Sequence, residues 1–474
     1  MLEWHFYVHD IIQHHKCWIF LFEKFKLKKM KNKYLIDTPP PTISGTLHIG
    51  HIFSYTQGDI IAKFQEYLGK ELVYPRCIDN NGIPTGKLAS TKGIKGTQNI
   101  IDFSLVKGKE YEQIFNNAGI SYGDNQFYHT HSDIAIQTCY TAFEFLKNQK
   151  IAYKKETEFL FSEKLQCSIS QSELNDEGLI ERTGEAPIIK KGIGWFIDIK
   201  NYLPEIKKMI EDINWKPIKF KKRMDNWLED IQWDWSISRE RHFGIPIPGE
   251  ENMTFDTWFI SSLSPQLAWS SYTGKSDIHC PIFDMRFQSH DIIRTWAFYT
   301  IAMSYFLNKQ IPWKTLMITG HTLDGSGGKL SKSLGNATAP KPLIDKYKQS
   351  GIRHWATTNS LGNDIQIDEN EMKMGWRISN KFNNAKKFID MQISNNWIGE
   401  DNSLYGEWLQ DKELILEAFN NFELDTANNL LYKFLWNKFC DIWIENSKKI
   451  AISLTLKKII LELEPIFGII YKKE

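Results

Sequence analysis

Two histidines three residues apart stand at the expected start of a helix in the stretch HIGH, His48 to His51. Residues at this spacing share one face of a helix, and the first turn of a helix offers unpaired backbone N–H groups and a partial positive charge. Gly50, between them, lets a ligand approach the backbone closely because it has no side chain. The pattern predicts a phosphate-binding site, with two surface histidines on an ordinary helix as the alternative.

Two lysines, Lys329 and Lys332, lie among glycines and serines in the stretch GGKLSKSLGN, Gly327 to Asn336. A cationic loop of this composition can close over a polyphosphate and neutralise the charge that develops there. A solvated basic loop is the alternative. The two stretches together, each beside an expected strand–helix crossover, indicate one site that handles a phosphate chain.

The segments around these residues predict a parallel sheet. KYLIDTPPP reads as a short buried strand that three prolines bring to an end, and apolar spacing from Leu47 to Leu68 predicts a helix that ends at Gly69. ELVYPRCI, which follows, reads as a second strand. Strand, helix and strand in this order are typical of a βαβ unit in a parallel sheet.

The rest of the chain divides into three kinds of sequence. The region from Lys150 to Gly194 is rich in glycine and polar residues and reads as a broken insertion between two halves of a sheet domain. Strand-like and helical pieces then alternate again, and beyond Trp376 only helical spacing remains. The predicted fold class is therefore α/β, a Rossmann-type parallel-sheet domain with a short insertion, followed by an all-α helical bundle.

Composition restricts the function little. The 474 residues carry 58 Lys and Arg against 57 Asp and Glu, a net charge of +1, so bulk charge does not indicate a nucleic-acid partner. The apolar run CWIFLF is too short to cross a bilayer. The basic run Lys24 to Lys33 reads as a solvated lead-in, with a tRNA-facing or transit-like segment as the alternative, and Met30 is an alternative start. We expect a cytoplasmic protein without membrane contact.

The cysteines never form a C-x-x-C pair, so their spacing fits neither a zinc site nor a compact disulfide framework. We expect reduced thiols. The six are Cys17, Cys77, Cys139, Cys167, Cys280 and Cys440.

HIGH and GGKLSKSLGN together resemble the two signature motifs of the class I aminoacyl-tRNA synthetases, HIGH and KMSKS, with Leu330 where methionine is usual. Among these enzymes the chain is most similar to the valine-specific ones, from about Tyr34 to the end. The similar blocks, in the same order, are IDTPPPTISGTLHIGHIFSYTQGDIIAKFQ, ISRERHFGIPIP, FDTWFISS, QSHDIIRTWAFYTI and GHTLDGSGGKLSKSLGN.

The resemblance implies an enzyme that attaches valine to tRNA(Val) through a valyl-adenylate, using ATP and substrate-bound Mg²⁺ and releasing AMP and pyrophosphate. We expect a monomer. The isoleucine-specific enzyme is the near alternative. An inactive tRNA-binding paralogue and a nucleotidyltransferase with a HIGH-type fold are alternatives from other classes.

The resemblance also implies roles for the motif residues on the nucleotide. His48, Gly50 and His51 would hold the ATP phosphates, and Lys332, helped by Lys329, would neutralise the departing pyrophosphate. Asp291 would bind the ribose, and the backbone of Gly320 and His321 would face the adenine.

The same resemblance places the amino acid. CIDNNGIPTG is similar to the family pattern GxDDNGLPTE, so Asp79 would pair with the substrate ammonium group. Pro39, Trp258 and Ile292 would form the apolar pocket for the side chain, with core packing as the alternative for the last two. The pattern departs from the family at Cys77, Asn80 and Gly86, which leaves ammonium recognition to Asp79 alone.

One domain of the family is missing from the expected organisation. Valine-specific enzymes ordinarily carry a large editing domain bracketed by zinc-binding C-x-x-C pairs, but LQCSISQSELNDEG keeps one cysteine of such a pair, Cys167, and the returning flank keeps none. We therefore expect no editing domain and no structural zinc. Arg239 and Arg241 would contact the acceptor end of the tRNA or form internal ion pairs, and the sequence leaves both possibilities open.

We expect six segments along the chain. The last would be a shortened anticodon-binding bundle without the family's later coiled-coil arm, whose contact with the anticodon the sequence leaves open. The segments are an N-terminal extension (1–33), the first half of the catalytic domain (34–150), a shortened connective insertion (151–194), the second half with the lysine loop (195–345), a stem-contact connector (346–375) and the helical domain (376–474).

Overall fold

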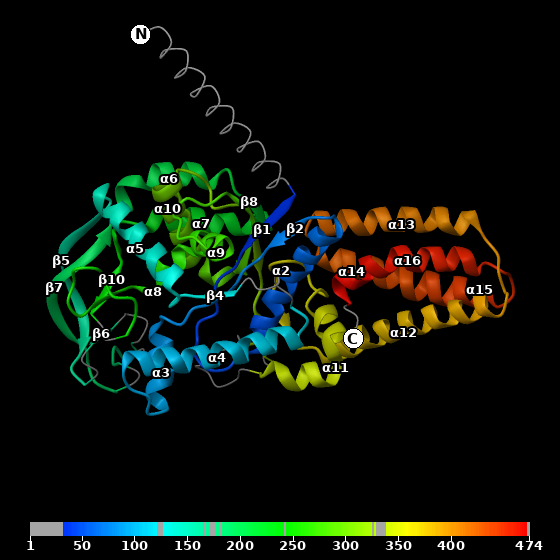
Figure 1. Cartoon of the computed structure of the whole chain (residues 1–474), viewed down its shortest axis with the longest axis horizontal. Coiled ribbons are helices and arrows are strands. Elements are labelled where there is room, and N and C mark those ends of the chain that lie inside the picture. The colour runs from blue at the N-terminus through cyan, green and yellow to red at the C-terminus, as the bar shows by residue number, and fades with distance from the viewer. Residues whose placement is uncertain are drawn as a thin grey trace, which may run out of the picture.

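The computed structural model describes residues 32–120, 127–164, 167–169, 174, 177–180, 183–240, 243–324, 327–328 and 338–471. The molecule is elongated, with the sheets gathered toward one end and a bundle of long helices at the other (Figure 1). The basic run that ends at Lys33 and the lysine loop lie almost wholly outside the described residues. Within those residues, no helix is long and apolar enough to cross a membrane.

A five-stranded parallel sheet forms the centre of the first part, as predicted. Its three middle strands are largely buried, as expected of parallel strands that are covered on both faces, although Asp284, Arg286 and Gln288 interrupt the apolar residues of one of them. In spatial order they are β2 (Glu71–Val73), β1 (Lys33–Asp37), β12 (Phe283–Ser289), β13 (Trp313–Thr319) and β8 (Asn214–Lys216).

The predicted helix after β1 is α2 (Ile49–Tyr67). Helix α2 is buried on almost every side, including all residues from Tyr55 to Ala62. It packs on the sheet and on the bundle through apolar side chains such as Phe53 and Phe64. The helix ends before Gly69, whose φ of 81° falls in the left-handed region that favours glycine. Helix α2 therefore lies between the central sheet and the helical part of the molecule and packs on both.

The segment ELVYPRCI forms two strands where the sequence indicated one. Its first part is β2, and its second part, β3 (Arg76–Ile78), pairs in parallel with β4 (Phe127–His129), outside the central sheet. Pro75 lies between the two strands and has no N–H for a ladder. The break turns the loop after Ile78 toward the end of β1.

The region from Lys150 to Gly194 is more ordered than its composition suggested. Strand β5 (Ala152–Ser162) and strand β7 (Ile188–Ile197) form a long antiparallel pair, in register from Ala152 opposite Ile197 to Phe161 opposite Ile188. The short strands β6 (Cys167–Ile169) and β9 (Trp235–Ser236) flank this pair. Lysine and glutamate stand together at 154–156 of β5 and apolar residues at 159–161, so the strand has no period-2 alternation. Its order comes from the long ladder with β7, which no local pattern announced.

The C-terminal part is helical, as predicted. Its helices bury a continuous apolar core that includes Phe382, Trp408, Phe434 and Phe467. They are α12 (Glu369–Ser394), α13 (Asn402–Asn420), α14 (Leu424–Tyr432) with the π-helical segment Lys433–Ile444 that continues it, α15 (Glu445–Ser447) and α16 (Ser453–Ile470).

The remaining elements surround the central sheet or connect it to the bundle. The helices are α3 (Ile83–Thr91), α4 (Thr97–Asn117), α5 (Asp133–Asn148), α6 (Leu203–Ile210), α7 (Lys221–Asp230), α8 (Thr257–Ser262), α9 (Ser264–Thr273), α10 (Phe298–Asn308) and α11 (Pro340–Trp355). The strands are β10 (Ser238–Glu240), β11 (Met253–Phe255), β14 (Thr322–Leu323) and β15 (Ile365–Gln366).

A buried arginine fastens the bundle to α2. Arg353, on α11, donates to the backbone oxygens of Ile469 (2.7 Å) and Ile470 (2.8 Å) at the end of α16 and to Asp59 on α2 (2.6 Å). The side chains of Arg353 and Asp59 are both fully buried. The last carbonyls of a helix have no partner within it and carry partial negative charge, so the guanidinium satisfies the end of α16 and the carboxylate together.

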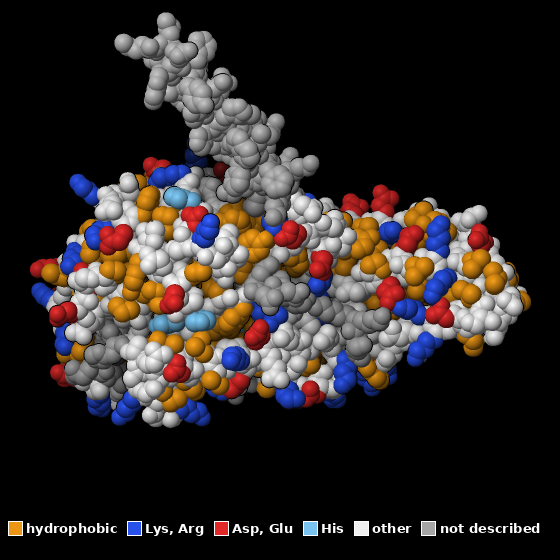
Figure 2. Space-filling model, viewed as in Figure 1, with side chains coloured by type: hydrophobic (Ala, Val, Ile, Leu, Met, Phe, Trp, Pro, Cys, Tyr) orange, Lys and Arg blue, Asp and Glu red, His pale blue; other side chains and the backbone are white. Residues whose placement is uncertain are grey.

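Charge on the surface is mixed. In the face shown in Figure 2, Lys and Arg side chains are interspersed with Asp and Glu over both parts of the molecule. This agrees with the net charge of +1. Bulk charge on this face does not single out a surface for a polyanion.

Candidate active site

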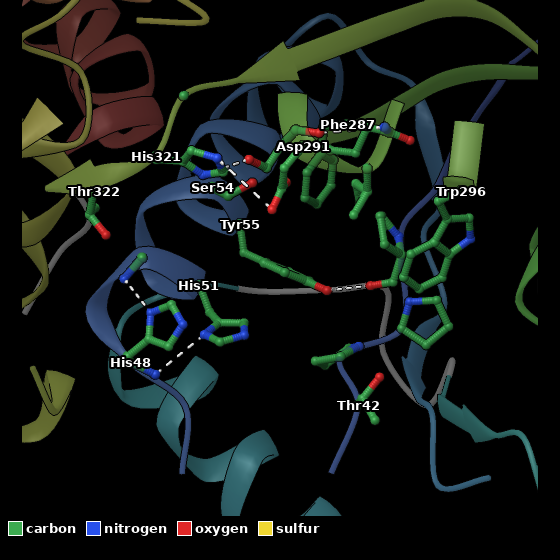
Figure 3. Close-up of a pocket in the computed structure, with 18 of the residues that line it drawn as sticks. Thr42, His48, His51, Ser54, Tyr55, Phe287, Asp291, Trp296, His321 and Thr322 are labelled. Carbon is green, nitrogen blue, oxygen red and sulfur yellow. Dashed lines mark hydrogen bonds and ion pairs between the residues drawn. The ribbon is translucent and has the colours of Figure 1, made fainter. Parts of the chain in front are cut away.

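A pocket of about 500 Å³ lies where strands β1, β12 and β13 end. Its wall includes Pro39 after β1, Ser289 at the end of β12 and Gly320 after β13. Ligands of open parallel sheets bind at this edge. Of the predicted site residues, the pocket brings together Pro39, His48, Gly50, His51, Asp291, Ile292, Gly320 and His321, and Figure 3 shows most of the side chains that line it.

His48 and His51 form the N-terminal cap of α2. Nδ1 of His48 accepts a hydrogen bond from the Gly50 backbone N–H (3.2 Å), and Nδ1 of His51 accepts one from the His48 backbone N–H (3.3 Å). A neutral imidazole carries its proton on the other nitrogen when one nitrogen accepts. Both rings are therefore Nε2–H tautomers, 4.0 Å apart, on the wall of the pocket (Figure 3).

Gly50 is required by the packing of the protein itself. A Cβ at this position would lie 2.6 Å from Thr322 Oγ1 and 2.9 Å from His48 Nδ1. Thr322 also lines the pocket, at the start of β14. A side chain at position 50 would thus separate the cap of α2 from the wall that follows β13.

Tyr55 holds the proline turn against α2. Its hydroxyl donates to the backbone oxygen of Pro39, and its ring meets Phe287 edge to face at 5.3 Å. Burial raises the pKa of Tyr55 above its ordinary value, so the phenol stays protonated and donates. Tyr55 is not among the predicted site residues, although its position four residues after His51 places it on the same face of α2.

Asp291 and His321 form the opposite wall. His321 Nδ1 lies 3.0 Å from the Ser289 hydroxyl, and its Nε2 lies 3.9 Å from Asp291 Oδ2. Figure 3 shows both side chains across the cavity from the two histidines of α2. The pocket therefore offers N–H donors at one end and a carboxylate with backbone groups at the other, which suits a ligand with a phosphate chain and a sugar.

Asp79 lies one layer behind the wall. It accepts hydrogen bonds from the backbone N–H of Asn81 (3.0 Å) and from the hydroxyls of Thr130 (3.2 Å) and Thr42 (3.3 Å). Thr42 lines the pocket, whereas Asp79 does not. Burial raises the pKa of Asp79 to about 6, against the lowering effect of these hydrogen bonds.

Trp258 and Ile292 differ in their access to the pocket. Ile292 lines it, while Trp258 packs edge to face on Trp296, which lines it, at 5.7 Å. Trp296 is not among the predicted site residues, although it stands four residues after Ile292 in QSHDIIRTWAFYTI, one helical turn further on.

The comparisons with known proteins agree with this geometry. Residues 14–252 and 249–368 match the family model of the class I tRNA synthetases (I, L, M and V), and residues 401–467 match that of the anticodon-binding domain of tRNA ligases. The chain belongs to the class I tRNA synthetases. It is therefore an aminoacyl-tRNA ligase.

Similar proteins include a Valine--tRNA ligase of Ehrlichia canis, 27% identical over 92% of this chain and 80% of the relative, and one of Ehrlichia ruminantium, 27% identical over 91% and 79%. Solved structures with the same fold include a methionyl-tRNA synthetase of Mycobacterium tuberculosis bound by methionyl-adenylate (TM-score 0.77, 16% identity, 93% of this chain and 92% of that one). A LeuRS of Agrobacterium radiobacter in a ternary complex with tRNA and LeuAMS is also similar (TM-score 0.78, 13% identity, 93% and 84%).

A buried ion pair supports the floor of the synthetase pocket. Arg286 on β12 and Asp37 on β1 are opposite each other in the sheet, and both side chains are almost fully buried. Asp37 also accepts from the indole N–H of Trp313 (2.8 Å) and the hydroxyl of Ser264 (3.0 Å). The ion pair joins β1, which leads into the proline turn at Pro39, to β12, which ends at Ser289. It therefore fixes the distance between these two parts of the pocket wall.

Arg239 forms an internal ion pair in the synthetase. Its guanidinium lies 3.0 Å from Asp256 and donates to the Ser238 backbone oxygen (2.7 Å). Of the two alternatives left open for this residue, the structure shows the internal one. Arg241 lies outside the described residues.

The lysines of the second motif, Lys329 and Lys332, lie outside the described residues, but the positions that flank them lie at the pocket. Thr322, before the loop, lines the cavity, and the backbone oxygen of Thr338, after it, accepts from the N–H of Ile49 in the first turn of α2 (2.9 Å). The described residues before and after the motif therefore lie next to the first turn of α2.

The described thiols are free and buried, namely Cys77, Cys139, Cys280 and Cys440. The side chain of Cys167 is not among the described ones; its backbone lies in β6. Within the described part of the chain, no group of three or more His, Cys, Asp and Glu side chains is arranged to hold a metal ion.

Replacing Asp79 by asparagine should stabilise the fold. A buried carboxyl whose folded pKa is about 6, against 3.8 ordinarily, is destabilising when ionised. At pH 7 we expect the Asp79→Asn variant to gain about 1–3 kcal/mol in free energy of unfolding. The gain should disappear below pH 3.8, where the carboxyl is protonated in both states. Urea unfolding at pH 7 and pH 3.5 measures the difference, and a loss of stability at pH 7 would contradict it.

Proposed function

We propose that this synthetase attaches valine to tRNA(Val) through a valyl-adenylate and that it does so without post-transfer editing. The observation that carries the proposal is the single pocket that unites the histidine pair of α2, Asp291 and the apolar side chains at Pro39 and Ile292. The valine-specific relatives support the choice of amino acid. Isoleucine as the substrate is the alternative.

The first step is attack of the valine carboxylate on the α-phosphorus of ATP, with pyrophosphate as leaving group. Positioning and charge stabilisation suffice for this reaction. The Nε2–H groups of His48 and His51 would donate to the phosphates, and Lys332 with Lys329 would neutralise the pyrophosphate. Mg²⁺ prefers phosphate oxygens and water, so we propose that it enters with ATP.

The two ends of the adenylate would then be held separately. Asp291 would take the ribose, and the backbone of Gly320 and His321 would face the adenine. The ionised Asp79 would pair with the ammonium group, reached past Thr42, while Pro39, Ile292 and Trp258 would surround the side chain. Because Asp79 has a pKa of about 6, we expect the KM for valine to rise as the pH falls below 6.

Two observations support the loss of editing. The alignment with the Ehrlichia canis enzyme extends over 653 positions, whereas this chain has 474 residues, so the relative has long internal stretches that this chain lacks. The strands β5 and β7, which bracket the expected place of insertion, pair directly with each other up to Phe161 and Ile188. We propose that the bundle contributes the anticodon contacts, that the enzyme is a monomer and that it needs no structural zinc.

One series of assays tests the proposal. ATP–pyrophosphate exchange should depend strongly on valine, weakly on isoleucine and measurably on threonine, because an apolar pocket alone rejects the isostere that adds a hydroxyl by only about 10². Preformed threonyl-tRNA should survive incubation with the enzyme. Stronger exchange with isoleucine, flat exchange with every amino acid, or rapid deacylation of threonyl-tRNA would contradict the amino acid, the activity or the loss of editing, respectively.

A further inference from the structure

Asp364, in the connector between α11 and the bundle, lies directly behind the pocket wall. Its carboxylate oxygen Oδ1 accepts a hydrogen bond from the backbone N–H of His321 (2.7 Å) and lies 3.0 Å from Nε2 of His290. Both partners are distant in the sequence, and His321 lines the pocket. Asp364 itself does not line it, so it can act on a ligand only through these neighbours.

The backbone around Asp364 is placed closely and by several contacts. The N–H of Ile365 donates to the oxygen of His321 (2.8 Å), where β15 pairs in parallel with β14. A Cβ on Gly320 would lie 1.9 Å from the backbone oxygen of Asn363, so only glycine fits there. The backbone N–H and the backbone oxygen of His321 are therefore both hydrogen-bonded to Asp364 and Ile365 of the connector.

His290 has its tautomer fixed by this arrangement. The guanidinium of Arg223 lies 2.9 Å from His290 Nδ1, and because a guanidinium only donates, Nδ1 must accept. The proton is then on Nε2, which donates to Asp364. The His290 ring stacks on Phe220, with 5.6 Å between the ring centroids, and its centroid lies 4.1 Å from that of the His321 ring. These contacts hold the side chain of the residue that directly precedes Asp291.

We propose that Asp364 is a positioning residue of the nucleotide subsite, which holds the His321 peptide and the His290 ring in the wall that receives the adenosine of ATP. This inference rests on the proposed function of that wall. One carboxylate oxygen serves two donors from segments that are 43 and 74 residues away. Without an acceptor at position 364, the His321 N–H loses its partner, and the backbone that faces the adenine is no longer fixed.

The same short loop also reaches the bundle. The side-chain amide of Asn359 donates to the backbone oxygen of Asp364 (2.9 Å), and the hydroxyl of Ser360 donates to Asp425 on α14 (2.6 Å). Asp364 therefore belongs to a segment that is hydrogen-bonded to the pocket wall at His321 and to the helical bundle at Asp425.

The experiment measures the affinity for ATP directly, by calorimetry in the absence of amino acid, together with the KM values for ATP and valine in pyrophosphate exchange. Asp364→Ala should weaken ATP binding and raise the KM for ATP by about tenfold, with the KM for valine changed less than about twofold. Asp364→Asn should restore ATP binding to within about threefold, since its amide oxygen can accept both hydrogen bonds. Asp345→Ala removes an exposed carboxylate of α11 and should leave both values unchanged.

The results separate the inference from the function on which it rests. If the wild-type protein gives no amino-acid-dependent exchange, the proposed function fails. If it exchanges normally but Asp364→Ala binds ATP as tightly as the wild type, or raises both KM values equally, the positioning role is wrong. An Asp364→Asn variant that binds ATP as weakly as Asp364→Ala would also overturn the positioning role, because this role requires a hydrogen-bond acceptor and not a charge.

Discussion

Replacing His48 by alanine is expected to slow ATP–pyrophosphate exchange by about 10²–10³-fold, the usual cost of removing one pre-positioned donor from a site where charge develops. The structure fixes the donor, because Nδ1 of His48 caps α2 and leaves Nε2 to carry the proton. The KM for valine should change much less than the turnover, since the imidazole lies at the end of the pocket that we propose to bind the phosphates. Exchange kinetics at saturating valine measure the effect.

His48→Asn is the matched control, because it keeps a side-chain acceptor at the N-cap of α2 but removes the imidazole Nε2–H. Asparagine is a good N-cap residue, so this variant should melt close to the wild type, while His48→Ala should lose about 1 kcal/mol of stability. Exchange should stay low in both, because the shorter amide does not reach as far into the pocket. Recovery of exchange in His48→Asn would mean that His48 acts only as a cap.

Replacing Arg353 by methionine is expected to lower the free energy of unfolding by about 3–5 kcal/mol. The substitution leaves the carboxylate of Asp59 buried without its cation and removes the donors to the oxygens of Ile469 and Ile470. Chemical denaturation monitored by tryptophan fluorescence measures the loss. Methionine fills much of the volume, so the effect reports the lost charge pair and hydrogen bonds and not a cavity.

Two further variants test this explanation. Arg377→Met changes an exposed arginine of α12 and should alter the stability by less than about 0.5 kcal/mol. The double variant Arg353→Met with Asp59→Leu should be more stable than Arg353→Met alone, because it also removes the buried carboxylate that has lost its cation. Equal stabilities of the single and double variants would show that the carboxylate is not responsible.

The sequence predicted the parallel sheet, the position of α2 and part of the pocket wall, because these depend on local periodicity and on short motifs. His48, Gly50 and His51 lie in one turn, and Gly320 with His321 directly follows a strand, so neighbours in the sequence are also neighbours at the site. Proximity to the carboxyl ends of β1, β12 and β13 then follows from the topology alone.

Other features depend on contacts that no local pattern contains. Asp79 was placed at the substrate by its motif, but its position behind Thr42 results from the parallel pairing of β3 with β4 after Pro75. Asp364 meets His290 and His321 only because β15 pairs with β14. Tyr55 and Trp296 were missed for a different reason, since their helical spacing from His51 and Ile292 was readable but is equally typical of core residues.

The antiparallel pair β5–β7 has a consequence for how this part of the molecule can change during evolution. Strand β5 ends at Ser162 and strand β7 begins at Ile188, and the adjacent residue Phe161 is the register partner of Ile188. An exit and a return at neighbouring points form a modular junction, at which an independently folding unit can be gained or lost while both strands keep their path. An insertion between these two residues would therefore leave the pairing of β5 with β7 in place.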